Sequence, residues 1–207
     1  MARRLSRDER REQLVAAAMP VLARRGLRDY SLEEIAERAG VTRNLLYHYF
    51  PRGRPDVTLA VAERAAEQLT ADWAVDETVP LAQRLADNFN RIAEHAMRPT
   101  HAWQIHRLAR AASEPELREM VARFVRVVIA NVAQNHLGTA DPPALVRLAL
   151  KAYVAFAETA LDEARVTGAD RHQVTSVLAN TLLATIDAAT VAAGNASYRA
   201  FATLSET

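Results

Sequence analysis

Apolar residues recur every three or four positions along almost the whole chain, which is typical of helices packed on one side. No segment shows the sustained alternation of apolar and polar residues that indicates a strand. The first helical run contains Leu14, Val15, Ala18 and Leu22. It is preceded by Ser6-x-x-Glu9, the spacing of a capping box, and followed by Gly26, a typical stop residue. The pattern predicts a first helix between Ser6 and Gly26 and an all-α fold.

Two short helices are predicted directly after the first. Ser31-x-x-Glu34 repeats the capping-box spacing, and Gly40 marks the end of that second helix. Thr42 is a suitable cap for a third helix that ends at Phe50-Pro51. The Pro- and Gly-containing residues 51–55 predict a turn.

The remainder of the chain predicts about six longer helices. Their expected ranges are 55–74, a segment after 78 that ends before 99, 100–112, 113–138, 141–168 and 170–194. Asp141 is the expected cap of the fifth of these helices, and the sixth is expected to start at Asp170. We therefore predict a three-helix domain over residues 1–55 and a larger helical domain over residues 56–207, with no element assigned to 195–207.

Composition removes several classes of function. The chain has no cysteine, which excludes disulfides, thiolate catalysis and cysteine-ligated metals. It carries no paired Glu-x-x-His motif, G-x-S-x-G motif or phosphate-binding loop, so neither an enzyme nor a cofactor is expected. His95, His101 and His106 are spaced by 6 and 5 residues, which does not bring three ligands to one helix face, so no metal site is predicted. No apolar run long enough for a membrane span and no secretory pattern occurs, so we expect a soluble cytoplasmic protein.

The near-neutral total charge hides an asymmetry. Residues 1–56 contain 12 Arg and 8 acidic residues, a balance of +4, whereas residues 57–207 have a balance of −3. A basic N-terminal segment is a modest indication of a polyanionic partner.

Residues 31–50, SLEEIAERAGVTRNLLYHYF, have the spacing of a helix-turn-helix. If the second helix enters a major groove, Arg43 and Asn44 at its exposed start suit guanine and adenine edges. Thr42 can donate to a phosphate at the positive helix end, and Tyr47 and His48 lie one turn further on, within reach of phosphates. An ordinary helical hairpin with a solvated polar face is the alternative.

Residues 9–60 resemble the DNA-binding domain of the tetracycline-repressor (TetR) family of transcriptional regulators. The resemblance rests on LVAAAMPVLARRG, SLEEIAERAGVTRNLLYHYFP and DVTLAV, and most of all on Tyr47-His48-Tyr49-Phe50-Pro51. It implies a homodimer on double-stranded DNA, in which the third helix of each subunit reads one half-site. By position it places Thr42, Tyr47 and His48 on phosphates and Arg43 and Asn44 on bases.

Further arginines extend the predicted DNA surface. The family usually has a phosphate-binding lysine shortly after Phe-Pro, where this chain has Arg52 and Arg54 in a turn one residue longer. The resemblance favours Arg54 for that role. Arg3, Arg4 and Arg7 form a basic arm that could lie in a minor groove, or could simply aid solubility.

The resemblance also implies a ligand cavity within the larger domain. Our candidates for its lining are Asn88, Phe89, His95, Trp103, His106, Phe124 and Tyr153. Each could equally belong to a plain core. The cavity would take a small-molecule effector of unknown identity.

The last two helices carry stripes of small and apolar residues. The resemblance implies that residues 142–167 and 170–192 meet their twins in a four-helix dimer interface. A hairpin buried within one chain is the alternative. The sequence thus predicts a repressor released from a palindromic operator by a small molecule, or else a DNA-binding regulator controlled by abundance or by a protein partner.

Overall fold

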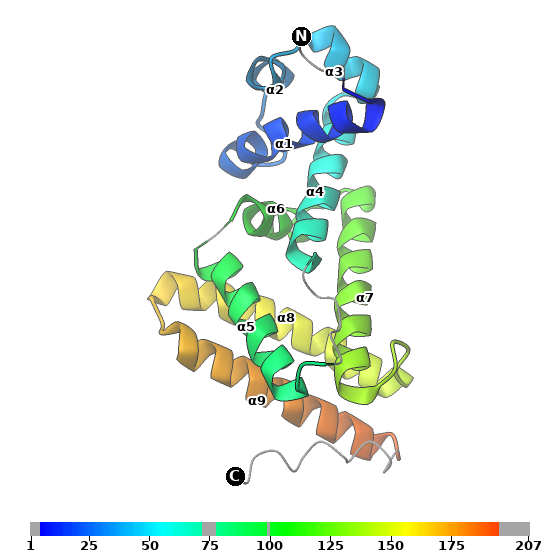
Figure 1. The fold of residues 1–207 in the computed structure, drawn as a ribbon, viewed down its shortest axis with the longest axis vertical. Coiled ribbons are helices and arrows are strands. Elements are labelled where there is room, and N and C mark those ends of the chain that lie inside the picture. Colours follow the sequence, from blue (N-terminus) through cyan, green and yellow to red (C-terminus); the bar gives the residue numbers. More distant parts are fainter. Residues whose placement is uncertain (1–4, 72–77, 99, 195–207) are drawn as a thin grey trace. The chain divides into compact units, whose positions relative to one another are not determined.

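The computed structural model describes residues 5–71, 78–98 and 100–194, so the last residues of the predicted helix 55–74 lie outside the described residues. The described residues form nine helices and no strand, which confirms the all-α prediction. The chain divides into two compact units (Figure 1). The first comprises Met1–Thr70 and Pro99–Ala122, and the second comprises Ala71–Arg98 and Arg123–Thr207.

The first unit begins with one longer helix, followed by the two short helices of the helix-turn-helix. They are α1 (Arg7–Arg25), α2 (Leu32–Ala39) and α3 (Arg43–Tyr49). The Ser6 and Glu9 capping box at the start of α1 is formed in both directions, as predicted. Thr42 caps α3 by accepting from the backbone N–H of Leu45, and this cap is confirmed as well.

Two further helices complete the first unit around a shared core. These are α4 (Arg54–Thr70) and α6 (His101–Arg110). The first unit also includes the beginning of α7 (Pro115–Leu137), whose later residues belong to the second unit. Helix α1 packs on α2, α4 and α6, and α4 also packs on α6. The core contains the fully buried side chains Leu14, Leu22, Tyr30, Ile35, Leu46, Phe50, Trp103 and Ile105. The domain boundary predicted from the sequence lies at residue 55, whereas the first compact unit extends to Thr70. The predicted functional division stays a prediction.

The second unit is built from longer helices. Its remaining elements are α5 (Leu81–Met97), α8 (Ala144–Thr167) and α9 (Arg171–Ala192). Helices α8 and α9 pack along each other, and α5 packs against both (Figure 1). Helix α9 starts directly after Asp170, as predicted, and the Asp170 carboxylate caps it by accepting from the backbone N–H of Gln173 at 3.0 Å. The predicted Asp141 cap is wrong, because α8 begins after Pro143 without a side-chain cap and the Asp141 carboxylate instead accepts from Arg147 at 2.7 Å.

Candidate nucleic-acid interface

Helix α3 is held in place by its inner face, while its outer face is left open. Leu46 is completely buried, and Val41 donates its backbone N–H to Ala36 across the turn at 2.9 Å. Gly40 provides the turn with a left-handed conformation, φ 65° and ψ 35°, that favours glycine. The short α2–α3 connection therefore fixes the direction of α3 through main-chain geometry and one buried anchor.

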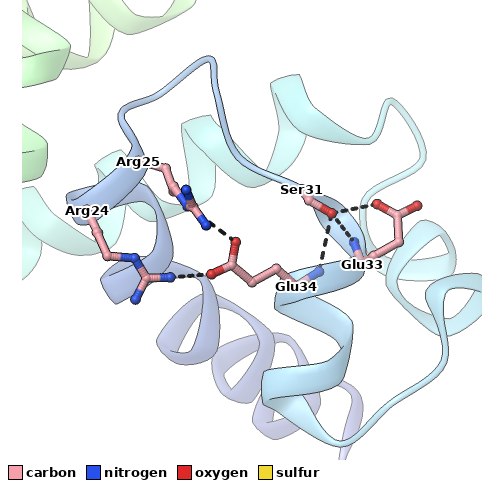
Figure 2. Close-up of polar contacts among 5 residues, drawn as sticks. All are labelled: Arg24, Arg25, Ser31, Glu33 and Glu34. Carbon is pink, nitrogen blue, oxygen red and sulfur yellow. Dashed lines mark hydrogen bonds and ion pairs between the residues drawn. The ribbon is translucent and has the colours of Figure 1, made fainter.

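The N-terminus of α2 is pinned from two sides (Figure 2). The Ser31 hydroxyl accepts from the backbone N–H groups of Glu33 and Glu34, which confirms this residue as a cap. The second half of the expected capping box is absent, because the Glu34 carboxylate extends the other way and pairs with Arg24 and Arg25 at the end of α1. Two arginines compete more strongly than one main-chain N–H for that carboxylate, so Glu34 joins α2 to α1 instead of closing its own helix end.

The five α3 residues predicted to meet DNA, Thr42, Arg43, Asn44, Tyr47 and His48, are all exposed. Arg43 is the most firmly held of them. Its guanidinium lies 2.6 Å from the Glu33 carboxylate and donates to the Tyr47 hydroxyl at 3.3 Å. It also lies over the Tyr47 ring, 5.4 Å from the centroid. The face therefore combines several hydrogen-bonding groups within little more than one helical turn.

The surroundings of Glu33 and Arg43 favour the charged form of each residue. The hydrogen bond from the Ser31 hydroxyl is the main reason that the pKa of Glu33 lies below its usual value, with Arg43 contributing. The Tyr47 hydroxyl and then Glu33 raise the pKa of Arg43. Both shifts thus favour the ion pair between Glu33 and Arg43.

Tyr47 is supported from behind by the turn that follows α3. Gly53 has φ 69°, and a Cβ atom there would lie 3.1 Å from Cε1 of Tyr47 and 3.4 Å from a methyl group of Leu32. Neither Gly53 nor Glu33 was among the residues predicted from the sequence. The sequence does show a carboxylate in the first turn of α2 and an arginine in the first turn of α3. These two residues come together only through the crossing of the two helices, so the sequence alone did not identify Glu33.

The two arginines of the 51–55 turn have different surroundings. Arg52 bonds to Asp56 at 2.6 Å and to Glu116 on α7 at 2.7 Å. Arg54 is exposed at the start of α4 and stacks over the Tyr30 ring at 5.7 Å from its centroid. Since Arg52 already has two carboxylate partners, Arg54 remains the stronger candidate for a phosphate contact. Arg7 is exposed at the start of α1, whereas the predicted arm residues Arg3 and Arg4 lie outside the described residues.

The residues predicted to line a ligand cavity fall into both compact units. Trp103 and His106 belong to the first, where both are almost fully buried and their rings lie 6.0 Å apart. Asn88, Phe89, His95, Phe124 and Tyr153 belong to the second. The Tyr153 hydroxyl donates to the main-chain oxygen of Leu178 at 2.8 Å, and burial raises its pKa. Asn88 accepts from Arg91 at 2.8 Å.

Helix α8 exposes much of the stripe that the sequence suggested for a dimer interface. Leu145, Leu148 and Phe156 are exposed to 41, 64 and 41 %. On α9 the predicted stripe behaves differently, because Leu178, Leu182, Ile186 and Ala189 are buried within the same chain and Val177 is exposed. The intrachain alternative thus accounts for most of the α9 stripe, and the α8 stripe is left uncovered.

The described residues also bear on metal binding and on membrane insertion. Across 5–71, 78–98 and 100–194, no three His, Asp or Glu side chains are grouped in a way that could hold a metal ion. By length and composition alone, α9 could cross a membrane. Because α9 packs along α8 and α5 through its buried face, the packing of a protein core accounts equally well for its apolar composition.

Comparisons with known proteins agree with this geometry. Residues 14–53 match the family model described as "Bacterial regulatory proteins, tetR family". The chain is 43 % identical over 68 residues to the HTH-type transcriptional activator FasR of Mycolicibacterium smegmatis, a match that covers 33 % of this chain and 31 % of that protein. The matched segment thus spans about a third of the length of this curated relative.

Solved structures extend the likeness of fold to nearly the whole chain. A tetR-family transcriptional regulator from Streptomyces coelicolor aligns with a TM-score of 0.77 at 23 % identity, over 94 % of this chain and 88 % of that one. The multidrug binding protein EbrR, complexed with imidazole, aligns with a TM-score of 0.56 at 20 % identity, over 84 % of this chain and 94 % of that one. The sequence match covers the helix-turn-helix, and the structural match adds the helices that follow. Residues 14–53 thus carry the helix-turn-helix of the tetR family of bacterial regulatory proteins, and the described residues have the fold of tetR-family structures.

Proposed function

We propose that this protein binds a palindromic operator as a homodimer and regulates transcription from it. The observation that carries the proposal is the open face of α3, on which Thr42, Arg43, Asn44, Tyr47 and His48 are all exposed on a helix fixed from behind. A recognition helix needs both properties, because its polar side chains must reach the groove while its axis stays in register.

The side chains of this face divide into two groups by chemistry. Arg43 and Asn44 present donors and an acceptor that suit guanine and adenine edges, and they supply sequence choice. Thr42, Tyr47, His48 and Arg54, together with the basic arm Arg3, Arg4 and Arg7, bind phosphates and supply affinity. The phosphate contacts make binding fall steeply as salt is raised.

The exposed stripe of α8 supports the homodimer. A large apolar side chain such as Leu148, 64 % exposed in a single chain, loses its contact with water when a second copy packs against it. Residues 142–167 and 170–192 then form the interface, and two-fold symmetry of the dimer matches two half-sites of a palindrome. A soluble cytoplasmic regulator without enzymatic activity, cofactor or membrane association follows from this role.

Regulation by a small molecule is the favoured mode of control. The fold is shared with the multidrug binding protein EbrR, whose structure contains imidazole. The effector would release the protein from its operator by binding one conformation better than the other. A protein that leaves its operator when the effector binds acts as a repressor. The similar protein FasR is named an activator, so repression is part of this proposal and is not taken from that relative. Control by abundance or a protein partner is the second candidate, and native mass spectrometry of the purified protein for a retained small molecule separates the two.

The central test is selection of a binding site from a pool of random duplexes, followed by a titration of the selected site. The wild-type protein is expected to enrich one palindrome. Arg43→Ala combined with Tyr47→Ala removes a base contact and a phosphate contact and should weaken binding roughly a hundredfold, since each base contact is worth about 1–3 kcal/mol.

A matched control separates this effect from the loss of positive charge. Arg118→Ala removes an exposed arginine on α7 and should leave operator affinity nearly unchanged. Absence of any enriched sequence in the wild-type selection, or unchanged binding by the double variant, would contradict the proposed function.

A further inference from the structure

The arrangement around Arg43 contains an acidic residue where a DNA-binding surface should avoid one. Glu33 and Arg43 are each 57 % exposed as side chains, and the Glu33 carboxylate is directly bonded to a residue that faces DNA in the proposed function. A fixed negative charge beside phosphates opposes binding of any duplex. An exposed ion pair stabilises a fold very little, and a carboxylate in the first turn of a helix adds only a small further amount, so stability gives little reason for the pairing with Arg43.

The carboxylate is not free to swing away from the surface. The Ser31 hydroxyl donates to it at 2.7 Å, and the same hydroxyl accepts from the Glu33 backbone N–H at 3.1 Å. Figure 2 shows the Glu33 side chain turned toward Ser31 and away from the Arg24–Glu34 pair. A cap residue that is itself fixed at a helix start thus holds Glu33 on the α3 side.

Arg43 in turn is held at three points. Its guanidinium forms an ion pair with Glu33, donates to the Tyr47 hydroxyl and lies over the Tyr47 ring. A guanidinium has five N–H donors in a planar fork, so two bonds within the protein still leave donors for the O6 and N7 atoms of a guanine. A free arginine loses considerable side-chain entropy when it binds a base, whereas an arginine already held in place loses less.

We propose that Glu33 is a specificity-determining residue, a positioning residue that orients Arg43 toward one base at the cost of affinity for DNA in general. This inference rests on the proposed DNA-binding function and deepens it. With Glu33 in place, Arg43 cannot adapt to a neighbouring phosphate or to another base without breaking its bond to the carboxylate. Correct sites keep the bond, and incorrect sites lose either the bond or the base contact.

The experiment compares Glu33→Gln with the wild-type protein on three duplexes at one salt concentration. The duplexes are the operator obtained by selection with the wild-type protein, the same operator with the Arg43-dependent base pair changed, and an unrelated sequence. Gln keeps the size of the side chain but removes its charge. Affinity for the unrelated duplex is expected to rise a few-fold, since a repulsive charge has been removed. Discrimination between the first two duplexes is expected to fall roughly tenfold, within the range that a bidentate arginine–guanine contact provides.

Glu37→Gln provides the matched control. Glu37 is exposed one turn further along α2, so its substitution changes the net charge equally without touching Arg43. It is expected to raise non-specific affinity while leaving discrimination at the wild-type value. A loss of discrimination equal to that of Glu33→Gln would overturn the proposal, because charge alone would then explain the effect.

A double-mutant cycle shows whether Glu33 acts through Arg43. In an Arg43→Ala background, Glu33→Gln is expected to leave discrimination unchanged. Circular dichroism and thermal unfolding of each variant establish that it is folded. If the wild-type protein selects an operator and Glu33→Gln discriminates as well as the wild type, the role of Glu33 is wrong while the proposed function stands. If the wild-type protein selects nothing, both fail.

Discussion

The exposed faces of α3 and α8 are both uncovered in a single chain, but their chemistry differs. On α3 the exposed residues are polar or carry a polar tip, and Arg43 is tied into place by Glu33 and Tyr47. On α8 the exposed residues include Leu148 and Phe156, whose side chains have no hydrogen-bonding groups. A polar face that is held rigid suits a directional, hydrogen-bonded partner, whereas an apolar face suits close packing against another apolar surface.

One buried polar side chain from each compact unit gives a second comparison. In the first unit the buried Tyr30 hydroxyl bonds to the main-chain oxygen of Arg54 at 2.8 Å and to the Thr58 hydroxyl at 2.9 Å. In the second unit the Nε2 atom of His136 is buried without a hydrogen-bond partner among the described residues. The Tyr30 hydroxyl is therefore satisfied by hydrogen bonds within the protein, whereas the Nε2 atom of His136 is not satisfied in the part of the chain that the structure describes.

The largest expected effect comes from charging the exposed face of α8. Leu148→Glu combined with Phe156→Glu places two carboxylates per subunit in the proposed interface, where each would lose its hydration without gaining a partner. The protein should become monomeric in sedimentation velocity. Operator affinity should fall by a factor on the order of 100 or more, because the two half-sites are no longer bound by one linked pair.

The control for this prediction is Val127→Glu, which charges an exposed residue of α7. It should leave both the dimer and the operator affinity intact. A dimer that survives the double substitution would show that the uncovered stripe of α8 has another purpose.

A smaller effect is expected from acid, and it should arise in the second unit. Burial, with some repulsion from Arg84, lowers the pKa of His136 from 6.5 to about 4. The folded state therefore binds fewer protons than the unfolded state between these values, and stability is full above about pH 6.5 and lost as the pH falls toward 4. The change corresponds to roughly 3 kcal/mol at most.

Urea unfolding at pH 7.5 and pH 4.5 measures this loss. His136→Leu removes the titrating group and should make the free energy of unfolding less dependent on pH. His172→Leu, a change at an exposed histidine of α9, should retain the wild-type dependence. An equally steep acid dependence in His136→Leu would place the sensitivity elsewhere.

The sequence predicted best those features that depend on residues close together in the chain. The caps Ser6 and Thr42, the start of α9 at Asp170 and the end of α2 at Gly40 each depend on residues within about one turn, and all were correctly predicted. The exposure of the polar residues of α3 also follows from local periodicity, since Leu46 fixes which side of the helix is buried.

The predictions that failed depended on partners distant in the chain or on competition between them. Glu34 lies at the spacing of a capping box, yet Arg24 and Arg25 bind its carboxylate across a turn. Asp141 has the chemistry of a cap, but Arg147 takes it. Glu33 was missed for the same reason, because its contact with Arg43 exists only once α2 and α3 cross. A periodic pattern shows which residues are apolar, and it could not distinguish the buried stripe of α9 from the exposed one of α8.

The smallest expected effect on operator binding comes from a comparison of two glycines that share one backbone conformation. Gly53 in the first unit and Gly138 in the second both have φ 69°. Alanine at either position should cost about 1–2 kcal/mol of stability, because a Cβ atom is strained in this region. At Gly138 nothing lies within 4 Å of the added methyl group, whereas at Gly53 it would meet Tyr47 and Leu32. Gly53→Ala should therefore also displace Tyr47 and weaken operator binding several-fold, while Gly138→Ala should not. Urea unfolding and operator titration of both variants measure the two effects separately, and equal operator affinities would show that Tyr47 needs no support from the turn.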